Sequence, residues 1–458
     1  MERIRRLSLG VLAAAALFGG AACGGITPAA APALPPARGS DFTVLAGRYI
    51  KHVVIVIQEN RSFESLFAGF PGADAPMTGD CLNSLGQLQQ IPLEPIDWTG
   101  TRTDLPHGYP AAWIDYDDGK MDGFCKAQIF PGQAAGLFPY TYMEHDLIAP
   151  YRTMAHRYVL ADHMFPTEAG GSFTGHLALL SGNTTLTPTT AVGLVPSAEP
   201  WGCDAPAGAT VPSITSAHTI QRPGPRPCFY QFTSIASTLD AAGVSWRYYA
   251  PWVNVPGSGR IWSEFDAIDD VRHSKHWKDV VSPETRVLED ASDDNLPSVA
   301  WVVPSYANSD HPPGAAHGPS WVASVVNAIG ESKDWNSSAI IVVWDDWGGF
   351  YDNVKPPQLD FRGLGVRVPC MIISPYAREH YVSHTQYEFG SILKFIEEVF
   401  DLPPIGPTSA GYTDMRATSI VDSFDFRQKP RHYHHIDAPD SKEYFLSQRP
   451  SGQPPDSE

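Results

Sequence analysis

Three separate segments of this sequence carry oxygen-bearing side chains in settings that could hold a cation and an activated hydroxyl. Glu59 and Asn60 follow one apolar run, and Asp345 and Asp346 follow another. Ser172 follows two glycines and begins a third apolar run. Adjacent carboxylates repel unless something cationic lies between them. A divalent cation that shares the serine oxygen would relieve this repulsion, lower the serine pKa and hold a phosphoryl oxygen.

Each segment, taken alone, also has an ordinary structural explanation. A serine after two glycines at a helix start is usually an N-cap, and Glu59 with Asn60 could form a loop or a helix cap. Asp345 and Asp346 could lie in a solvated loop. That explanation fits poorly, because the pair directly follows an apolar run that should be buried and precedes two glycines. We therefore expect the segments to converge with Ser172 at one site.

Histidines in loops near the predicted strand ends could assist this chemistry. They are His107, His311 and His317, which lie in glycine- and proline-rich stretches. An imidazole can donate to a phosphate oxygen or protonate a leaving group. A single histidine is more often structural than catalytic, but three in such loops favour a functional role.

Short β-branched runs predict the strands that must position these residues. Strands are expected over residues 53–57, 158–165, 245–249, 298–304, 339–344 and 366–374. Helices are expected after Ser172 and over residues 234–242, 321–329 and 387–400, the last from apolar residues at helical spacing. This alternation predicts a layered α/β fold with a mostly parallel central sheet and helices on both faces. Ligand sites in such sheets lie beyond the carboxyl ends of the strands.

The N-terminus has the pattern of a targeting segment. Residues 1–22 are predicted as a signal peptide, because three arginines precede the apolar run 7–18 and small residues follow it. Cys23 stands where a bacterial lipoprotein is lipidated, and cleavage by ordinary signal peptidase is an equal alternative. The Ala- and Pro-rich residues 24–42 predict a disordered tether. We expect an exported protein: periplasmic, cell-surface lipoprotein or secreted.

The remainder is expected to be a catalytic domain over residues 43–430, followed by a C-terminal tail over residues 431–458. Long loop insertions that could act as caps are expected near residues 70–140 and 184–290. The formal net charge of −18 makes nucleic acid an unsuitable partner.

Cysteine positions suggest disulfides rather than a metal-binding knuckle. In an oxidising compartment, neighbouring cysteines in loop-rich stretches are expected to pair. This predicts the bonds Cys81–Cys125 and Cys203–Cys228. Cys370 lies inside an apolar run and is expected to be a buried free thiol.

Five motifs resemble those of a known family. In chain order they are KHVVIVIQENRSFESLF, GKMDGF, EAGGSFTGHLALLSG, SDHPPGAAHG and VVWDDWGGFYDNV. They resemble the bacterial phosphoesterase family that contains phospholipases C and an acid-phosphatase branch, within the alkaline-phosphatase-like superfamily. The resemblance covers residues 51 to about 400. It implies an α/β/α sandwich, one active-site metal ion and a covalent phospho-enzyme.

The resemblance also implies roles for single residues. Ser172 is the implied nucleophile and also a metal ligand. The other implied ligands are Glu59, Asn60, Asp345 and Asp346. Phosphate contact or proton transfer is implied for His107 and His311, with His311 the acid for the leaving group.

Some residues depart from the family pattern. Phospholipase-type members often have Thr-Phe-Pro-Asn-Arg around the nucleophile, whereas residues 172–176 read Ser-Phe-Thr-Gly-His. This segment is more similar to the phosphatase branch. Glu64 replaces an aspartate, for which we expect a structural role. Asn353 replaces a histidine and cannot transfer protons.

We therefore expect an exported, metal-dependent phosphoric ester hydrolase acting through phospho-Ser172. A phospholipase C acting on phosphatidylcholine-like diesters is the close alternative. A non-catalytic surface lipoprotein that binds phosphorylated ligands is an alternative of another class. The substrate would be a small phosphate ester or a phospholipid, with a lipid anchor if Cys23 is modified. Oxygen ligands allow calcium, magnesium, manganese or zinc, and the oligomeric state stays open.

Overall fold

The computed structural model describes residues 39–83, 85–100, 103–198, 201–251, 262–313 and 316–449. The predicted signal peptide, Cys23 and residues 24–38 of the predicted tether lie outside these residues. The compact unit Ser40–Glu458 carries all the elements below, apart from Gly39, which is the first residue of the first helix. Among the described residues, no helix has the length and apolar character needed to cross a membrane.

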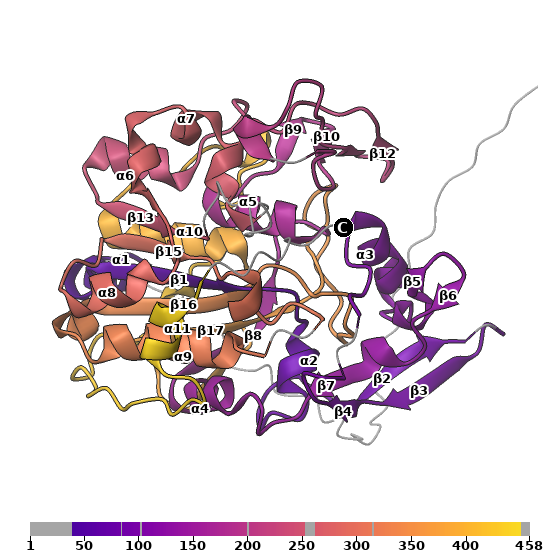
Figure 1. The fold of residues 1–458 in the computed structure, drawn as a ribbon, viewed down its shortest axis with the longest axis horizontal. Coiled ribbons are helices and arrows are strands. Elements are labelled where there is room, and N and C mark those ends of the chain that lie inside the picture. Colours follow the sequence, from indigo (N-terminus) through magenta and orange to yellow (C-terminus); the bar gives the residue numbers. More distant parts are fainter. Residues whose placement is uncertain are drawn as a thin grey trace, which may run out of the picture. The chain divides into compact units, whose positions relative to one another are not determined.

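A central sheet of nine strands organises the described part of the chain (Figure 1). In spatial order its strands are β14 (Val280–Val281), β13 (Trp246–Tyr249), β15 (Val299–Val302), β1 (His52–Gln58), β16 (Ser338–Trp344), β17 (Val368–Ile373), β8 (Val159–Phe165) and β18 (Tyr381–Ser383), and β19 (Tyr387–Glu388) also pairs with β8. Strand β17 runs antiparallel to both of its neighbours, and the other pairs are parallel. The sheet is therefore mostly parallel, as predicted.

The core strands are apolar because both of their faces are covered. Every residue of β16 and β17 is buried, which is typical of β-branched runs in a parallel sheet. All six strands predicted from the sequence are present, and their ends lie within two residues of the predicted bounds.

Helices pack on both sides of this sheet (Figure 1). The first set is α5 (Ser172–Ser181), α6 (Ile235–Ala242), α7 (Asp269–Arg272) and α10 (Phe389–Phe400), in which α5 contacts α6 and α10. The second set is α4 (Ala149–Arg157), α8 (Arg286–Ser292), α9 (Gly318–Gly330) and α11 (Lys442–Ser447), in which α9 contacts the other three. The predicted α/β/α sandwich is confirmed.

Helix α10 begins two residues later than its apolar spacing predicts. Tyr387 and Glu388 pair with β8 as the short strand β19. Glu388 then caps the helix, with its side chain and that of Ser391 bonded reciprocally to backbone N–H groups. The capping box, rather than the hydrophobic pattern, sets this boundary.

The insertion near residues 70–140 forms small elements that lie together beyond one end of the central sheet, at the right of Figure 1. They follow α2 (Phe63–Phe67) and comprise β2 (Thr78–Leu82), β3 (Leu88–Pro92), β4 (Glu94–Ile96), α3 (Tyr109–Tyr116), β5 (Gln128–Phe130), β6 (Gln133–Ala134) and β7 (Thr141–Met143). Cys81 and Cys125 form a disulfide with Cα atoms 5.7 Å apart. The sequence of this insertion shows no periodicity, so these strands were not predicted.

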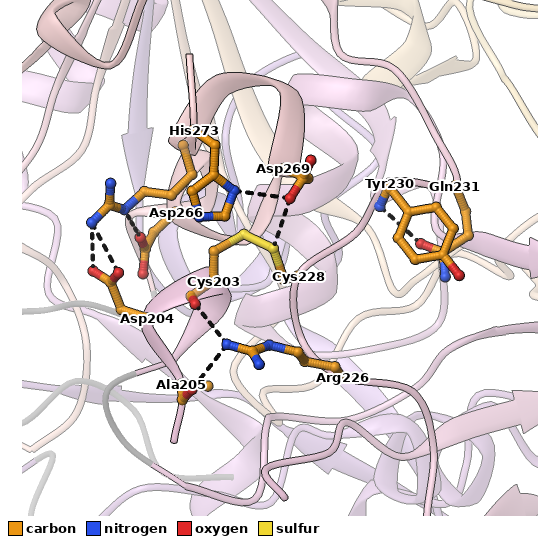
Figure 2. Close-up of a disulfide and its surroundings, with 11 residues drawn as sticks. Cys203, Asp204, Ala205, Arg226, Cys228, Tyr230, Gln231, Asp266, Asp269 and His273 are labelled. Atoms are coloured by element: carbon orange, nitrogen blue, oxygen red, sulfur yellow. Dashed lines mark hydrogen bonds and ion pairs between the residues drawn. A yellow bond between two sulfur atoms is a disulfide. The ribbon is translucent and has the colours of Figure 1, made fainter. Parts of the chain in front are cut away.

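The insertion near residues 184–290 has two different halves. Its first half contains an antiparallel sheet of β9 (Thr185–Thr187), β10 (Thr190–Val192), β11 (Ser213–Thr215) and β12 (Ile220–Gln221). Cys203 and Cys228 form a disulfide beside Asp269 and His273 (Figure 2). The second half, from α6 to β14, belongs to the central sandwich instead of a cap.

Both ends of the described chain pack more closely than expected. The predicted tether ends early, because residues from Gly39 onward form α1 (Gly39–Tyr49). A Cβ at Gly47 would lie 2.7 Å from the Val399 carbonyl oxygen, so α1 lies directly against the end of α10. In the predicted C-terminal tail, Phe445 of α11 packs on Trp321 with ring centroids 5.4 Å apart.

Cys370 is a buried free thiol in the middle of β17. Burial raises the pKa of this thiol far above its usual range. A protonated, buried thiol behaves as a small apolar side chain.

Candidate active site

The exit loops of β1 and β16 lie side by side because the two strands pair in parallel along their whole length. The Asp345 N–H donates to the Gln58 carbonyl at 3.0 Å, and the Arg61 N–H donates to the Asp346 carbonyl at 3.1 Å. The Asn60 N–H donates to Asp345 Oδ1 at 3.1 Å. The two polar segments singled out in the sequence therefore meet at one edge of the sheet.

A close crossing of the two loops fixes their geometry. Asn60 has a φ of 54° and Gly348 a φ of 61°. A Cβ at Gly348 would lie 2.2 Å from the Asn60 carbonyl oxygen, so only glycine fits there. The Gly348 N–H also donates to Asp346 Oδ1 at 2.7 Å, which orients that carboxylate.

Helix α5 brings the serine to the same place. Gly171 is its extended N-cap, and Ser172 is its first residue. Ser172 Oγ lies 3.1 Å from Asp346 Oδ2 and 3.2 Å from Asn60 Oδ1. A Cβ at Gly175 would lie 2.5 Å from the Asp345 carbonyl oxygen, so the helix approaches the β16 exit loop as closely as a glycine allows.

These residues form one buried group, which we call the Ser172 cluster: Glu59, Asn60, Ser172, Asp345 and Asp346. None of them is more than 1% exposed. Three carboxylates without water around them would repel strongly if nothing positive lay among them.

His176 belongs to the same site and was not predicted from the sequence. Its Nε2 lies 2.6 Å from Glu59 Oε1 and 3.7 Å from Asp345 Oδ2, and its side chain is fully buried. Burial lowers the pKa of His176 to about 4, and this outweighs the attraction of Asp345. The spacing could have identified His176, because it follows Ser172 by four residues and residues four apart on a helix share a face.

The donor set fits a divalent cation. Asp345 Oδ2 is buried and accepts no hydrogen bond from the described residues, so it has lone pairs available for a ligand bond. Carboxylate, amide and hydroxyl oxygens are the ligands of hard divalent ions. One atom each of Glu59, His176 and Asp345 lies within 4.8 Å of the others, and imidazole suits transition metals.

His107 contacts the cluster through Asn60. Its Nδ1 lies 2.5 Å from the Leu105 carbonyl oxygen, so Nδ1 carries a proton. Its Nε2 lies 2.7 Å from Asn60 Nδ2 and accepts from that amide. This contact turns Asn60 Oδ1 towards Ser172, which makes His107 a positioning residue for the amide oxygen.

His311 is held near the cluster by the backbone around Asp310. The Asp310 N–H donates to Gln58 Oε1 at 3.0 Å, and Arg61 donates twice to the Asp310 carbonyl, at 3.1 and 2.9 Å. The rings of His311 and His107 are 6.0 Å apart. His311 Nδ1 donates to the Pro312 carbonyl, so proton transfer by His311 would use Nε2.

His317 is directed elsewhere. Its Nδ1 lies 2.9 Å from Asp440 Oδ2, and its Nε2 lies 3.1 Å from the Tyr444 hydroxyl. Both ring nitrogens thus contact the C-terminal segment. The sequence gave no indication that this segment lies beside His317. The structure does not bring His317 to the Ser172 cluster.

Glu64 lies in a buried charge network next to the site. Its carboxylate is 4.0 Å from Arg367, which also pairs with Asp352 at 3.0 Å. Burial, and then repulsion by Asp352, raises the pKa of Glu64 to about 9. Arg367 NH2 also donates to Asn353 Oδ1 at 2.9 Å, which gives Asn353 a structural contact.

A pocket of about 540 Å³ opens beside His107. Its walls include the apolar side chains of Ile129, Phe130 and Leu194 and the charged side chain of Arg222. Asp104 and Arg222 give these walls one charge of each sign, so it is their apolar part that suits an apolar leaving group.

Comparisons with known proteins identify the family of this chain. The model of the family described as Phosphoesterase family matches residues 50–403. Phospholipase C B of Mycobacterium tuberculosis (strain ATCC 25618 / H37Rv) is 26% identical over 444 residues, which cover 83% of this chain and 78% of that protein. Non-hemolytic phospholipase C of Pseudomonas aeruginosa is 25% identical over 416 residues, which cover 78% of this chain and 55% of that protein.

One solved structure that is similar to this chain is a protein in the alkaline phosphatase superfamily from Vibrio parahaemolyticus. It is 11% identical and has a TM-score of 0.37, with 79% of this chain and 69% of that chain covered. The family match spans every segment that contributes to the Ser172 cluster.

Proposed function

This chain belongs to the Phosphoesterase family and is a phosphoric ester hydrolase, and we propose that it works with one divalent metal ion through a phosphoserine at Ser172. The observation that carries the proposal is the position of Ser172 Oγ, 3.1 Å from Asp346 Oδ2 and 3.2 Å from Asn60 Oδ1. Loops from β1 and β16 and the start of α5 supply these atoms. An N-cap serine alone needs neither partner.

Each residue of the site has a part in the proposed reaction. Ser172 Oγ gives its proton to Asp346 Oδ2, 3.1 Å away, and attacks phosphorus, and the bond from phosphorus to the leaving oxygen breaks. The first N–H groups of α5 would donate to the phosphoryl oxygens, as at other helix N-termini. His311 gives a proton to the leaving oxygen, and water then releases phosphate from the serine.

The Ser172 cluster would hold the metal ion, and His176 would contribute to its surroundings. A bound divalent ion would lower the pKa of the serine hydroxyl and offset charge on the phosphoryl oxygens. Asp346 and Asn60 keep the hydroxyl in place, and His107 keeps the Asn60 amide in its orientation.

Trapping the intermediate tests the nucleophile. Acid quenching during turnover of p-nitrophenyl phosphate should give a phosphorylated peptide that contains Ser172, identified by mass spectrometry. Ser172→Ala should lose both the phosphopeptide and turnover. Ser181→Ala, at the other end of the same helix, is the matched control and should keep both. Full turnover by Ser172→Ala would refute the proposal.

Metal removal tests the cation. Dialysis against a chelator should abolish turnover, and adding back calcium, magnesium, manganese or zinc singly should identify the ion that restores it. Asp346→Asn should not recover with any of them. Turnover that survives complete removal of metal would contradict the proposal.

A phospholipase C activity on lipid diesters is the second candidate. It is favoured by the apolar pocket beside His107 and by the names of the relatives, whereas the residues around Ser172 resemble the phosphatase branch. Comparing p-nitrophenyl phosphate with p-nitrophenylphosphorylcholine separates the two activities. A preference for the monoester supports a phosphatase, and a preference for the diester supports a phospholipase C.

We also propose that the protein is exported, from the arginines and apolar run that precede Cys23. Fractionation of cells that express the full chain would place it in the periplasm, on the surface or in the medium. Incorporation of labelled palmitate that Cys23→Ala abolishes would identify a lipoprotein. A protein that stays in the cytoplasm would overturn this proposal without affecting the one for Ser172.

A further inference from the structure

We propose that Asp162, His163 and His384, here called the Asp162 group, form a second metal site that takes zinc or a similar transition-metal ion. His163 Nδ1 lies 2.7 Å from Asp162 Oδ1, and His384 Nδ1 lies 2.8 Å from Asp162 Oδ2. One ligand atom from each of the three lies within 4.8 Å of the others. Two imidazoles and one carboxylate are a common protein contribution to a zinc site with an open position.

The group is separate from the Ser172 cluster. Asp162 and His163 lie on β8, and His384 directly follows β18 at the edge of the sheet. Strand β17 lies between β8 and β16, whose exit loop carries Asp345 and Asp346. Neighbouring strands are about 4.8 Å apart, so two steps across the sheet separate β8 from β16 by about 10 Å.

The Asp162 carboxylate is held in place before any ion arrives. It is fully buried, and Oδ2 also accepts from the Asp74 N–H at 2.9 Å. Arg367 NH1 donates to the Asp162 carbonyl at 2.7 Å and so fixes the backbone. The guanidinium charge of Arg367 faces Asp352 at 3.0 Å, which offsets its repulsion of a cation.

Exposure of the histidines gives an ion access to this anchored carboxylate. The side chain of His163 is 24% exposed and that of His384 is 60% exposed. Water could therefore complete the coordination, as in open zinc sites. Asp74 contacts the group through its backbone N–H, while its carboxylate accepts from Asn353 Nδ2 at 2.9 Å.

The spacing of the ligand atoms is compatible with a metal ion. Ligands on a tetrahedral zinc ion with bonds of about 2.0–2.1 Å lie about 3.3 Å from one another. The nitrogen–oxygen separations here are 2.7 and 2.8 Å, so small side-chain rotations suffice. Each imidazole would bind the ion through Nδ1 and carry its proton on Nε2 instead.

Metal stoichiometry tests the site. The metal-free full chain is dialysed against zinc and the bound zinc is measured by mass spectrometry. His163→Ala/His384→Ala should bind one zinc ion fewer per chain than the wild type. His432→Ala/His434→Ala, which removes two exposed histidines outside the group, is the matched control and should show no loss.

Cobalt gives a second readout that depends on ligand geometry. Cobalt bound at the Asp162 group should add visible absorption bands that the double variant lacks and the control keeps. His384→Ala alone replaces a mostly exposed side chain, so it tests the proposal if the double variant fails to fold. Equal zinc binding by the wild type and these variants would overturn the proposal and leave the two histidine–Asp162 contacts as structural interactions. Because the readout is a difference of one ion, it does not depend on whether the Ser172 cluster binds metal.

Discussion

Two groups in this molecule combine histidine with carboxylate at almost the same distance. In the Ser172 cluster, His176 Nε2 lies 2.6 Å from Glu59 Oε1. In the Asp162 group, the two imidazole nitrogens lie 2.7 and 2.8 Å from the oxygens of Asp162. The histidines differ in exposure, which is 0% for His176 and 24% and 60% for His163 and His384.

The comparison shows that full burial of a histidine can outweigh a close contact with a carboxylate. Burial lowers the pKa of His176 to about 4, so this histidine stays neutral at pH 7 and cannot balance the carboxylates around it. Burial alone would raise the pKa of Asp162, but hydrogen bonds from His163 and the Asp74 N–H bring it below its usual range. The carboxylates of the Ser172 cluster are therefore left with a charge that the proposed metal ion would offset.

The largest expected difference between the two groups is in turnover. Ser172→Ala should lower kcat/KM for p-nitrophenyl phosphate by roughly 10³-fold or more, since the nucleophile itself is lost. His163→Ala/His384→Ala should stay within about twofold of the wild type, because distant sites act independently. Loss of turnover in the double variant, with its fold intact by circular dichroism, would show that the Asp162 group also acts in the reaction.

The next difference is in metal affinity at the Ser172 cluster. His176→Ala removes the side chain that contacts Glu59 and should weaken binding of the activating ion by about 10–100-fold. Titration of the metal-free enzyme measures this affinity directly. His163→Ala is the control and should leave the affinity for the activating ion unchanged. An unaltered affinity in His176→Ala would show that the imidazole has no effect on the ligands.

A smaller effect is expected from the close approach of α5. In Gly175→Ala the added methyl group would meet the Asp345 carbonyl oxygen at 2.5 Å. We expect a loss of about 1–3 kcal/mol in unfolding free energy from this overpacking, measured by urea denaturation, together with lower turnover. Ser181→Ala, on the same helix, loses the hydrogen bonds of its hydroxyl with Leu177 and Asn183 and should also cost about 1–3 kcal/mol, but it should keep turnover. Wild-type stability in Gly175→Ala would mean that the Asp345 carbonyl moves away from the added methyl group at no cost in unfolding free energy.

The smallest effect concerns pH. A carboxylate whose folded pKa is below its unfolded value stabilises the fold above the unfolded pKa, and this stability is lost as the pH falls through the folded pKa. In metal-free protein, Asp162→Asn should therefore lower the thermal midpoint at pH 7. The difference should narrow below about pH 4, the unfolded value. A difference that does not change with pH would show that Asp162 acts through packing alone.

Local patterns in the sequence were sufficient to predict the strands and the helix that position the site. The β-branched runs at β1 and β16 predicted buried parallel strands, and parallel strands bring Asn60 and Asp345 to one edge. The two glycines before Ser172 predicted the helix start. The structure brings all five predicted ligands together because each depends on a strand end or a helix end, which sequence patterns locate well.

Contacts made at long range could not be predicted in this way. His317 lies in a loop as suitable as that of His311, but it contacts Asp440, 123 residues later in the chain. The polar strands of the first insertion have no periodicity to mark them. His176 was identifiable from its helical spacing, but its contact with Glu59 depends on how α5 packs against the sheet.

The buried thiol of Cys370 can be used to measure how often the central sheet becomes exposed to solvent. In the described part of the chain the other cysteines are joined in disulfides, so this thiol alone can be alkylated there. It lies fully buried on β17, between the strand that leads to Asp345 and the strand that carries Asp162. The rate at which an alkylating reagent modifies the peptide containing Cys370 therefore measures how often the strand between the two proposed metal sites becomes exposed.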